Sequence, residues 1–404
     1  MLSVDEAQRL VREHTAAMRI VSLPLANAVG HTFAEALYAR ESIPRFDNAA
    51  MDGYALRAED CANAREQSPL HLRVVARQQA GGASKRRIGS GECARIFTGA
   101  AMPDGTDTVL MQERVERDGD CIIVTKPPRA GEHVRRRGEE FANGAVALRE
   151  GSCATPAAIG MCATLGYARV RVYARPRVTL LVTGNELRTP GAILAPGQIP
   201  DANSYSIRAA LTLMGYNCSV LRVRDDALRM LETVRGVLKS SDVLITSGGV
   251  SVGEHDVVRE VMQQVGVCEH FWRVAMKPGK PVFFGTRGQR MVFGLPGNPL
   301  SALLGLYLFV RPALRQCMAL PVDTRRVNAT LASPLRNDSD REHFVFVELR
   351  DSANSLPQAF PLSSQGSHML GAVAHAAAFL RLPASAGNWE AGRTVEVEYM
   401  RWDM

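Results

Sequence analysis

The sequence between residues 176 and 310 alternates regularly between short apolar runs and segments with helical spacing, and no other feature constrains the fold as much. Residues 178–182 (VTLLV) and 218–223 (CSVLRV) are two such runs, each followed by polar residues and then by a predicted helix. Strands that alternate with helices form a doubly wound, mostly parallel sheet. We therefore predict an α/β domain here, with Asn203 as the cap of its first helix.

A glycine-rich loop follows another predicted strand of this region. Residues 246–256 read TSGGVSVGEHD, and apolar residues at helical spacing begin again at Val257. Gly248, Gly249 and Gly253 permit positive φ and the close approach of a ligand. The start of the next helix offers unpaired N–H groups to an anion. The loop is therefore expected to hold a phosphate group.

Acidic residues follow three of the predicted strands. Glu186 lies in TGNEL, Asp226 in the Asp225-Asp226 pair, and Asp256 at the end of the glycine-rich loop. A single acid after a strand is most often a helix cap. Ligands of an open parallel sheet, however, bind outside the carboxyl ends of its strands. The three acids, the glycine-rich loop and GLPGNP (294–299) are all expected at that edge, which favours a binding site.

A short turn between two prolines carries two lysines. Residues 276–281 read MKPGKP, so Lys277 and Lys280 are held on a stiffened backbone. Lysine side chains are usually only solvated, but the rigid turn favours a fixed cationic site for an oxyanion.

Two β-rich regions and a helical start complete the chain. Ser3 and Glu6 form a capping-box pattern for a helix of about four turns over residues 3–19. Short β-like runs fill residues 70–125 and the region after Pro321. We predict an elongated α/β multidomain protein divided as 1–44 with 140–175 (a discontinuous, helical or mixed N-terminal domain), 45–139 (β-rich), 176–320 (α/β) and 321–404 (β).

Charge and cysteine content narrow the function classes. The net charge of +7 favours anionic partners. No helix-turn-helix, RNP or zinc spacing supports nucleic-acid binding. The eight cysteines are scattered without a CxxC spacing, which predicts reduced thiols in a cytoplasmic protein. The longest apolar stretch, Leu300–Val310, is too short to span a bilayer and predicts a buried helix, and no secretory signal is expected at the N-terminus.

Eight ordered motifs resemble the molybdopterin molybdenumtransferases of the MoeA type, to which the gephyrin E domain is similar. The resemblance covers nearly the whole chain. The motifs are FDNAAMDGYA (46–55), TGAAMPDGTDTV (98–109), RRRGEE (135–140), TGNEL (183–187), SGGVSVGEHD (247–256), KPGKP (277–281), GLPGNPLSA (294–302) and QGSH (365–368).

The resemblance implies an elongated homodimer that inserts molybdate into adenylylated molybdopterin and releases AMP, assisted by Mg2+. It also implies molybdopterin adenylyltransferase and molybdoenzyme-maturation proteins as possible partners. Four carboxylates are implied as catalytic, namely Asp256, Glu186, Asp226 and Asp52, and the first three also as Mg2+ ligands.

The resemblance further implies two sets of substrate contacts. The molybdate site would contain Lys277, Lys280, Ser301 and Ser367. The pterin substrate would contact Ser247, Gly248, Gly249, Ser251, Gly253, Thr98, Arg135, Glu140, Pro296, Asn298 and Pro299. Asp52 and Thr98 are expected to reach a cleft completed by the partner subunit.

The sequence departs from the family pattern at four positions. Asn185 and Glu140 stand where aspartates are usual, and Ala49 where serine is common. Phe346 replaces an arginine, and Arg341 and Arg350 are the candidates to compensate for it. Phe346 keeps open a non-catalytic gephyrin-like scaffold or cofactor-binding paralogue. A second alternative is molybdopterin adenylyltransferase, whose single α/β domain shares the SGG loop, although that domain usually lacks the surrounding modules found here.

Overall fold

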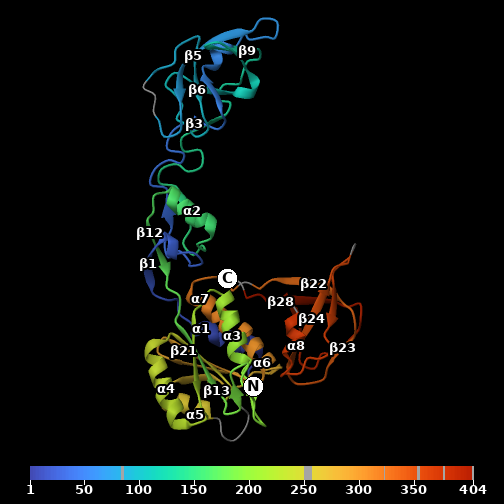
Figure 1. Cartoon of the computed structure of the whole chain (residues 1–404). Coiled ribbons are helices and arrows are strands. Elements are labelled where there is room, and N and C mark those ends of the chain that lie inside the picture. Colours follow the sequence, from blue (N-terminus) through green and yellow to red (C-terminus); the bar gives the residue numbers. More distant parts are fainter. Residues whose placement is uncertain (83–85, 250–256, 323, 353–354, 376–377, 403–404) are drawn as a thin grey trace.

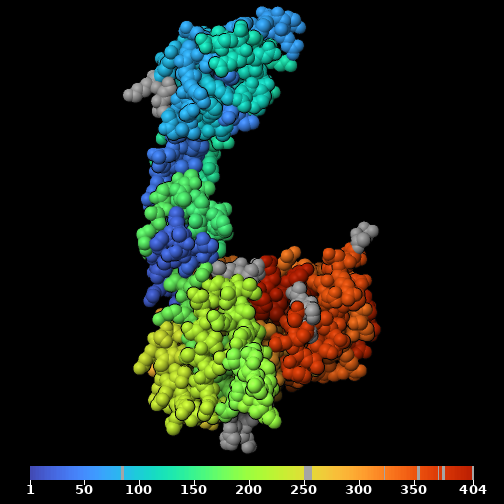
Figure 2. Space-filling model, in the orientation of Figure 1, coloured from blue at the N-terminus to red at the C-terminus, as the bar shows by residue number. Residues whose placement is uncertain are grey.

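A computed structural model describes residues 1–82, 86–249, 257–322, 324–352, 355–375 and 378–402. The molecule is elongated (Figure 1). A β-rich module stands at one end, a narrow connector follows, and the α/β domain and the C-terminal β domain lie next to each other at the other end. The space-filling view shows the same separation of the β-rich module from the other two domains (Figure 2).

A six-stranded mixed sheet organises the α/β domain, in the order β16-β13-β17-β21-β20-β18. The first four strands are parallel, and β20 and β18 run antiparallel to their neighbours. The predicted doubly wound, mostly parallel sheet is thus confirmed. The strands are β13 (Val178–Thr183), β16 (Cys218–Val223), β17 (Val243–Ser247), β18 (Cys268–Phe271), β20 (Phe283–Arg287) and β21 (Arg290–Leu295).

Helices cover both faces of this sheet, and each face has its own core. Leu180 and Val182 point to one face, which α3, α6 and α7 cover, while Leu181 between them points to the face covered by α4 and α5. Every residue of β13 and β17 is buried, which explains their continuous apolar runs. The helices are α3 (Asn203–Leu213), α4 (Ala227–Ser240), α5 (Val257–Gln264), α6 (Pro299–Gly305) and α7 (Arg311–Cys317).

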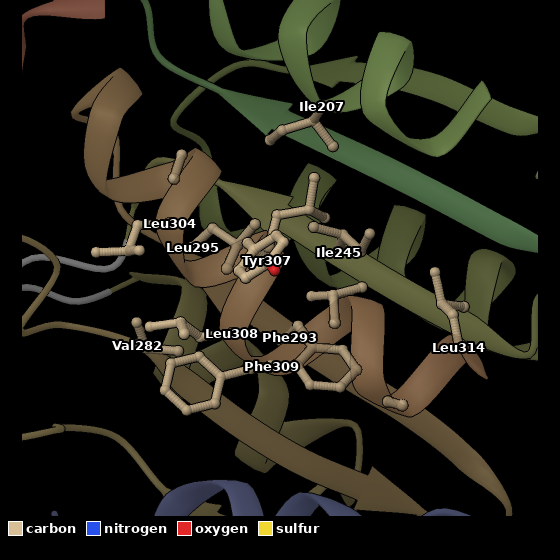
Figure 3. Packing of buried hydrophobic residues seen from close by; sticks show 14 of the residues in the cluster. Ile207, Ile245, Val282, Phe293, Leu295, Leu304, Tyr307, Leu308, Phe309 and Leu314 are labelled. Carbon is tan, nitrogen blue, oxygen red and sulfur yellow. The ribbon is translucent and has the colours of Figure 1, made fainter. Parts of the chain in front are cut away.

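A buried π-helical segment, Leu306–Val310, joins α6 to α7. Tyr307 and Phe309 from this segment lie among Ile245 and Phe293 of the sheet and Ile207 of α3 (Figure 3). The predicted buried helix over Leu300–Val310 is therefore confirmed. No helix in the described part of the chain has the length and apolar character needed to cross a membrane.

The first helix, α1 (Val4–Glu13), begins as predicted but is shorter than predicted. The Ser3 side chain accepts from the backbone N–H of Glu6 at 3.2 Å, and the Ser3 N–H donates to the Glu6 carboxylate at 2.7 Å, which confirms the capping box. The expected continuation to residue 19 is wrong. Gln316 of α7 donates to the carbonyls of Arg12 and Thr15, at 2.8 and 2.7 Å, and so satisfies groups that a longer helix would bond internally.

Two antiparallel pairs build the connector, and a third lies at the base of the β-rich module (Figure 1). The connector pairs are β1 (Ile20–Pro24) with β12 (Arg169–Tyr173) and β2 (Leu37–Tyr38) with β11 (Val146–Leu148), and the third pair is β3 (Asn48–Ala49) with β10 (Val134–Arg135). Helix α2 (Pro156–Thr164) lies beside the connector pairs. The two connector pairs join residues 20–38 to residues 146–173, which supports the proposed discontinuous domain of 1–44 with 140–175. The domain boundaries themselves remain a proposal.

Sheets also form the two β-rich parts. The module beyond the connector is a single sheet in the order β7-β4-β6-β5-β9-β8, and the C-terminal sheet runs β19-β24-β25-β22-β28-β26. In the C-terminal sheet β24 also pairs with β26, which closes the sheet on itself. The strands of the module are β4 (Gly53–Leu56), β5 (Leu70–Gln78), β6 (Glu92–Ile96), β7 (Thr108–Met111), β8 (Glu116–Asp118) and β9 (Cys121–Val124). The C-terminal strands are β22 (Arg326–Leu331), β24 (Glu342–Arg350), β25 (Gln358–Pro361), β26 (Ala378–Leu382) and β28 (Thr394–Tyr399).

One strand of the C-terminal sheet comes from the α/β domain. Strand β19 (Met276–Lys277) pairs in parallel with β24, with Lys277 opposite His343. The turn with the two lysines is therefore fixed between the two domains. The remaining short elements are β14 (Leu187–Arg188) paired with β15 (Ile199–Pro200), β23 (Leu335–Asn337) paired with β27 (Gly387–Trp389), helix α8 (Leu370–His375), and three single turns of 3-10 helix at Leu25–Asn27, Ala58–Cys61 and Gln112–Arg114.

Candidate functional site

A cavity of about 910 Å³ opens at the carboxyl edge of the parallel strands. The ends of β13, β17 and β21 meet there because their registers align, with Val182 opposite Ser247 and Ser247 opposite Leu295. The lining combines this edge with the lysine turn and the QGSH segment of the C-terminal domain. It includes Thr183, Gly184, Glu186, Asp201, Asn203, Asp225, Ser247, Gly248, Gly249, Lys280, Pro296, Gly297, Asn298, Pro299 and His368.

The glycine-rich loop needs glycine at its first two positions. Gly248 has φ +88°, and a β-carbon there would lie 2.7 Å from the Thr183 carbonyl oxygen. Gly249 has φ +69°, and a β-carbon there would lie 2.4 Å from a methyl carbon of Val258. Both conditions exclude an ordinary side chain. The backbone of the loop therefore lies directly on the strand ends, within the cavity lining.

The two adjacent aspartates after β16 have different positions. Asp225 lines the cavity, and its carboxylate accepts from the Thr183 hydroxyl and, at 3.1 Å, from the Asn185 N–H. Asp226 is the N-cap of α4 and accepts from the Arg229 N–H at 3.0 Å. The structure thus brings Asp225 to the cavity wall, whereas the sequence pointed to Asp226. Helix α4 needs an N-cap residue, and either Asp225 or Asp226 could have supplied it. The sequence alone could not tell which of the two does so.

Glu186 is an unpartnered carboxylate on the same wall. It is exposed, and within the described residues its oxygens have no hydrogen bond or ion pair. Its side chain folds over Gly184, where a β-carbon would lie 2.9 Å from both carboxylate oxygens. Glu186 can therefore accept a ligand or a cation without first breaking a contact within the described part of the chain.

Asn203 does not cap α3 as predicted. The cap position is Ala202, and the carboxylate of Asp201 accepts from the Ser204 N–H at 2.9 Å. Asn203 instead donates its amide hydrogens to the Ser247 hydroxyl oxygen at 2.8 Å and to the Gly297 carbonyl at 2.9 Å. It ties the start of α3 to the ends of β17 and β21, and its role was missed because a helix-start asparagine normally indicates a cap.

Asp201 is the buried anchor of this helix start. It is 1% exposed and accepts from Arg222 of β16 at 3.0 Å as well as from Ser204. A buried carboxylate is costly unless it is hydrogen-bonded and paired in this way. The isolated aspartate in the sequence gave no sign of this network.

The two lysines of the MKPGKP turn face different surroundings. Lys280 lines the cavity, and its carbonyl accepts from the Val274 N–H at 3.0 Å, which closes the turn. Lys277 is exposed on β19. Its positive charge contributes to lowering the pKa of the neighbouring His343 to about 4, although burial of the His343 ring is the larger cause. His343 is therefore a neutral neighbour of this lysine at physiological pH.

The two predicted molybdate serines lie where the α/β and C-terminal domains meet. Ser301 is buried near the start of α6. The Ser367 hydroxyl accepts from the Asn298 side chain, and the Ser367 carbonyl accepts from the Leu300 N–H, both at 3.1 Å. These bonds hold the QGSH segment against the first turn of α6, at the border of the cavity.

Phe346 is part of the hydrophobic core and does not line the cavity. It is fully buried against Phe379, and its N–H donates to the Gln365 side chain at 2.7 Å. Neither candidate for compensation lines the cavity in the described residues. Arg350 pairs with Glu348 at 2.9 Å, and Arg341 lies 3.9 Å from Asp340. Among the described residues that line the cavity, Lys280 is therefore the one with a fixed positive charge.

Three predicted site residues, Ser251, Gly253 and Asp256, lie outside the described residues, as does His255. Within the described part of the chain, no group of three or more histidine, cysteine, aspartate or glutamate side chains is arranged to hold a metal ion.

Four predicted site residues lie far from the cavity in the same chain. Asp52 accepts from the backbone N–H and the hydroxyl of Thr98, at 2.8 and 2.7 Å, and these bonds hold the pKa of Asp52 below its usual range. Arg135 is exposed on β10, and the Glu140 N–H donates to the Ile43 carbonyl. Figure 1 shows β3 and the rest of the module at the opposite end of the molecule from β13. One chain alone does not bring these residues to the cavity.

His368 is a cavity residue that the sequence did not single out. In the sequence it stands only as the last residue of the QGSH motif, next to Ser367. The eight cysteines, all of which lie in the described residues, form no disulfide.

Comparison with known proteins covers almost the entire chain. Residues 2–166 match the MoeA N-terminal region (domain I and II), residues 179–316 a probable molybdopterin binding domain, and residues 328–400 the MoeA C-terminal region (domain IV).

Named relatives agree with these matches. A molybdopterin molybdenumtransferase of Staphylococcus aureus (strain MRSA252) is 33% identical over 402 residues, which are 98% of this chain and 95% of that protein. Molybdopterin molybdenumtransferase 2 of Mycobacterium tuberculosis (strain CDC 1551 / Oshkosh) is 35% identical over the full length of both chains. The crystal structure of the molybdopterin biosynthesis MoeA protein from Pyrococcus horikosii superposes with a TM-score of 0.82 at 30% identity, covering 99% of each chain.

Proposed function

This chain belongs to the MoeA family of molybdopterin molybdenumtransferases, and we propose that it inserts molybdate into adenylylated molybdopterin at the cavity described above, with release of AMP. One observation carries the proposal. The cavity joins a glycine loop suited to phosphate, an unpartnered carboxylate at Glu186 and a cationic turn at Lys280. A phosphoanhydride substrate and an oxyanion require these three kinds of group.

The pterin phosphates would lie on the backbone of the glycine-rich loop. Gly248 and Gly249 present main-chain atoms to the cavity because no side chain stands between. Asn203 uses the Ser247 oxygen as an acceptor, so the Ser247 hydroxyl hydrogen is directed away from Asn203 and can serve a phosphate oxygen. Ser251, Gly253, Pro296, Asn298 and Pro299 complete the proposed substrate contacts.

Molybdate would bind as a substrate between the two domains. It is a dianion, and Lys280 with Lys277 supplies positive charge while Ser301 and Ser367 supply hydroxyl donors. The Asn298 and Leu300 bonds to Ser367 fix this serine before the substrate arrives. Preorganised donors of this kind favour an oxyanion because they need not reorganise when it binds.

The donor set fits a magnesium ion. Mg2+ is usually held by one or two carboxylates together with substrate phosphates and waters. Glu186 is available at the cavity wall, and Asp225 stands beside it in the lining. Asp256 is a further proposed ligand, while Asp226, to which the sequence pointed, caps α4 and is replaced in this set by Asp225. When bound, the ion would neutralise charge on the phosphoanhydride during its cleavage.

A second subunit would complete the site. In this proposal the protein is a cytoplasmic homodimer in which Asp52, Thr98, Arg135 and Glu140 of one chain reach the cavity of the other. Their distance from the cavity within one chain supports this arrangement. Molybdopterin adenylyltransferase would supply the substrate, and molybdoenzyme-maturation proteins would receive the product.

The replacement of the usual arginine by Phe346 favours one alternative, a non-catalytic paralogue that binds the cofactor. The two proposals differ in whether the protein converts adenylylated molybdopterin to product or only binds it. We expect purified protein, given adenylylated molybdopterin, molybdate and magnesium, to release AMP and to activate a cofactor-free molybdoenzyme. Tight pterin binding without AMP release would refute the insertase proposal and support the paralogue.

A further inference from the structure

Five ionisable side chains line the cavity within the described residues, namely Glu186, Asp201, Asp225, Lys280 and His368. Two of them are already engaged. Asp201 is bonded by Ser204 and Arg222, and Asp225 by Thr183 and Asn185. Glu186 and Lys280 have the charges proposed above to hold a cation and an oxyanion. His368 is the remaining group, and the proposed function gives it no task.

The position of His368 is set by the segment on either side of it. Gln365 accepts from the Phe346 N–H and donates to the Leu362 carbonyl, both at 2.7 Å, which fixes the segment to the C-terminal sheet. Ser367 is fixed to the start of α6. Gly366 leaves room for the imidazole, since a β-carbon there would come within 3.0 Å of its Cε1. His368 is thus held at the cavity from the side of the C-terminal domain.

The ring nitrogens of His368 are unengaged within the described residues, unlike those of His31 and His270. No hydrogen bond or ion pair joins the His368 ring to another residue in the described ranges. By contrast, the His31 ring is bonded to the Tyr173 carbonyl at 2.9 Å, and the His270 ring to Thr286 at 2.8 Å. An imidazole that lines the cavity without such a bond keeps both ring nitrogens available to a substrate.

The proposed reaction contains a proton transfer beside this ring. When molybdate joins the dithiol of the pterin, two Mo–S bonds form, one Mo–O bond breaks, and the oxygen leaves as water. That oxygen gains two protons, and the two thiols lose two. The step is therefore balanced without an oxidant or a reductant, but the protons must move from sulfur to oxygen.

We propose that His368 is a catalytic residue that relays a thiol proton to the departing molybdate oxygen. This inference rests on the proposed function and names the residue that moves the proton in that reaction. Imidazole suits the step because one ring nitrogen can accept a proton while the other donates one. The other ionisable groups of the cavity are less suited to this transfer. Lys280 is proposed to hold the oxyanion and Glu186 to hold a cation, while Asp201 and Asp225 are engaged in hydrogen bonds within the protein.

Chemical rescue tests this role. We expect His368→Ala to lower kcat for cofactor formation by about 100-fold, a typical effect of losing a general acid–base group, with little change in the KM for molybdate. Imidazole added to the buffer should restore a large part of kcat. His71→Ala, which removes an exposed histidine in β5 of the remote module, should change neither value and respond to no imidazole. His368→Gln, which preserves bulk and hydrogen bonding, should be as slow as His368→Ala.

Other outcomes would overturn the assignment. If kcat is unchanged in His368→Ala, or if His368→Gln has full activity, the ring transfers no proton. If the loss appears in the KM for molybdate and imidazole does not reverse it, His368 is only a binding residue. A thermal midpoint equal to that of the wild type excludes misfolding as the cause of a slow variant. A wild-type chain that releases no AMP would refute the proposed function itself, and this inference with it.

Discussion

At the scale of single residues, the neighbours of each cavity position determine which residue type fits there and what role it has. Gly249 is the clearest example, because its φ of +69° and the Val258 methyl group both exclude a β-carbon. Asp225 and Asp226 are adjacent, but one lines the cavity and the other caps a helix. These differences predict how substitutions at the site will behave.

Gly249→Ala should be destabilising and should weaken substrate binding. The left-handed backbone conformation alone costs about 1–3 kcal/mol for a residue with a β-carbon. Gly236→Ala is a matched control, because Gly236 lies in α4 with open space around it, and there alanine should stabilise by up to about 1 kcal/mol. Chemical denaturation of both variants measures the two effects. Equal stability changes at the two glycines would contradict the geometry of the loop.

The two aspartates should respond differently to alanine. Asp226→Ala should cost about 0.5–2 kcal/mol of stability, as expected for a lost helix cap, and leave most AMP release intact. Asp225→Ala should reduce AMP release strongly, because it removes a cavity carboxylate together with its bonds to Thr183 and Asn185. Denaturation and AMP assays on both variants separate the roles. Activity lost only in Asp226→Ala would restore the assignment made from sequence.

At the scale of elements, short pairs of strands carry the chain from one domain to the next. The Asp47 carboxylate, next to β3, accepts from the Arg137 N–H at 2.7 Å and from the Arg136 side chain at 2.8 Å. These contacts join the segment before β3 to the segment after β10. The first of them is the main reason that the pKa of Asp47 lies below its usual value.

The pH dependence of stability should reveal this contact. A carboxyl group whose pKa is lowered on folding stabilises the protein above its unfolded pKa, and this contribution is lost as the pH falls through the folded value. The difference in thermal midpoint between wild type and Asp47→Asn should therefore be constant near neutrality and shrink below about pH 4. Asp118→Asn, at a carboxylate on the exposed strand β8, provides a comparison. A difference that grows on acidification would contradict the assignment.

Sequence patterns predicted the elements well where burial decides them and poorly where polar side chains choose between partners. The run 178–182 had to be a strand because its apolar residues are buried on both faces of the sheet, and 218–223 pairs beside it as the edge strand. Asn203, by contrast, could either cap α3 locally or hydrogen-bond to residues far along the chain. It donates to Ser247 and Gly297 and does not cap the helix. The end of α1 depended in the same way on Gln316, which lies 304 positions beyond Arg12 along the chain.

At the scale of the whole molecule, the elongated shape separates two halves of one proposed site. The cavity holds Glu186 and Lys280, while Asp52 and Thr98 are at the far end of the same chain. The sequence placed both sets in one function only through family resemblance, since no local pattern reports a contact between subunits. The separation makes the subunit arrangement testable.

Mixing inactive subunits should restore activity if the site is shared. Asp52→Ala and Glu186→Ala would each be inactive alone, but in a mixed dimer one of the two sites would contain both native residues. Equal mixing and exchange should then return about a quarter of wild-type activity, since half of the symmetric dimers are mixed and each has one intact site. Mixtures that remain inactive after exchange would show that the two residues act within one chain or not in the same site.

The central claim is that molybdate insertion takes place in the cavity at the carboxyl edge of the sheet. The most direct measurement compares molybdate-dependent AMP release in Glu186→Gln and Glu232→Gln. Glu232 is the control because it lines a second cavity of about 660 Å³ at the opposite edge of the same sheet. We predict that Glu186→Gln loses most of the activity while Glu232→Gln retains it. Full activity in Glu186→Gln, or a loss only in Glu232→Gln, would contradict the account.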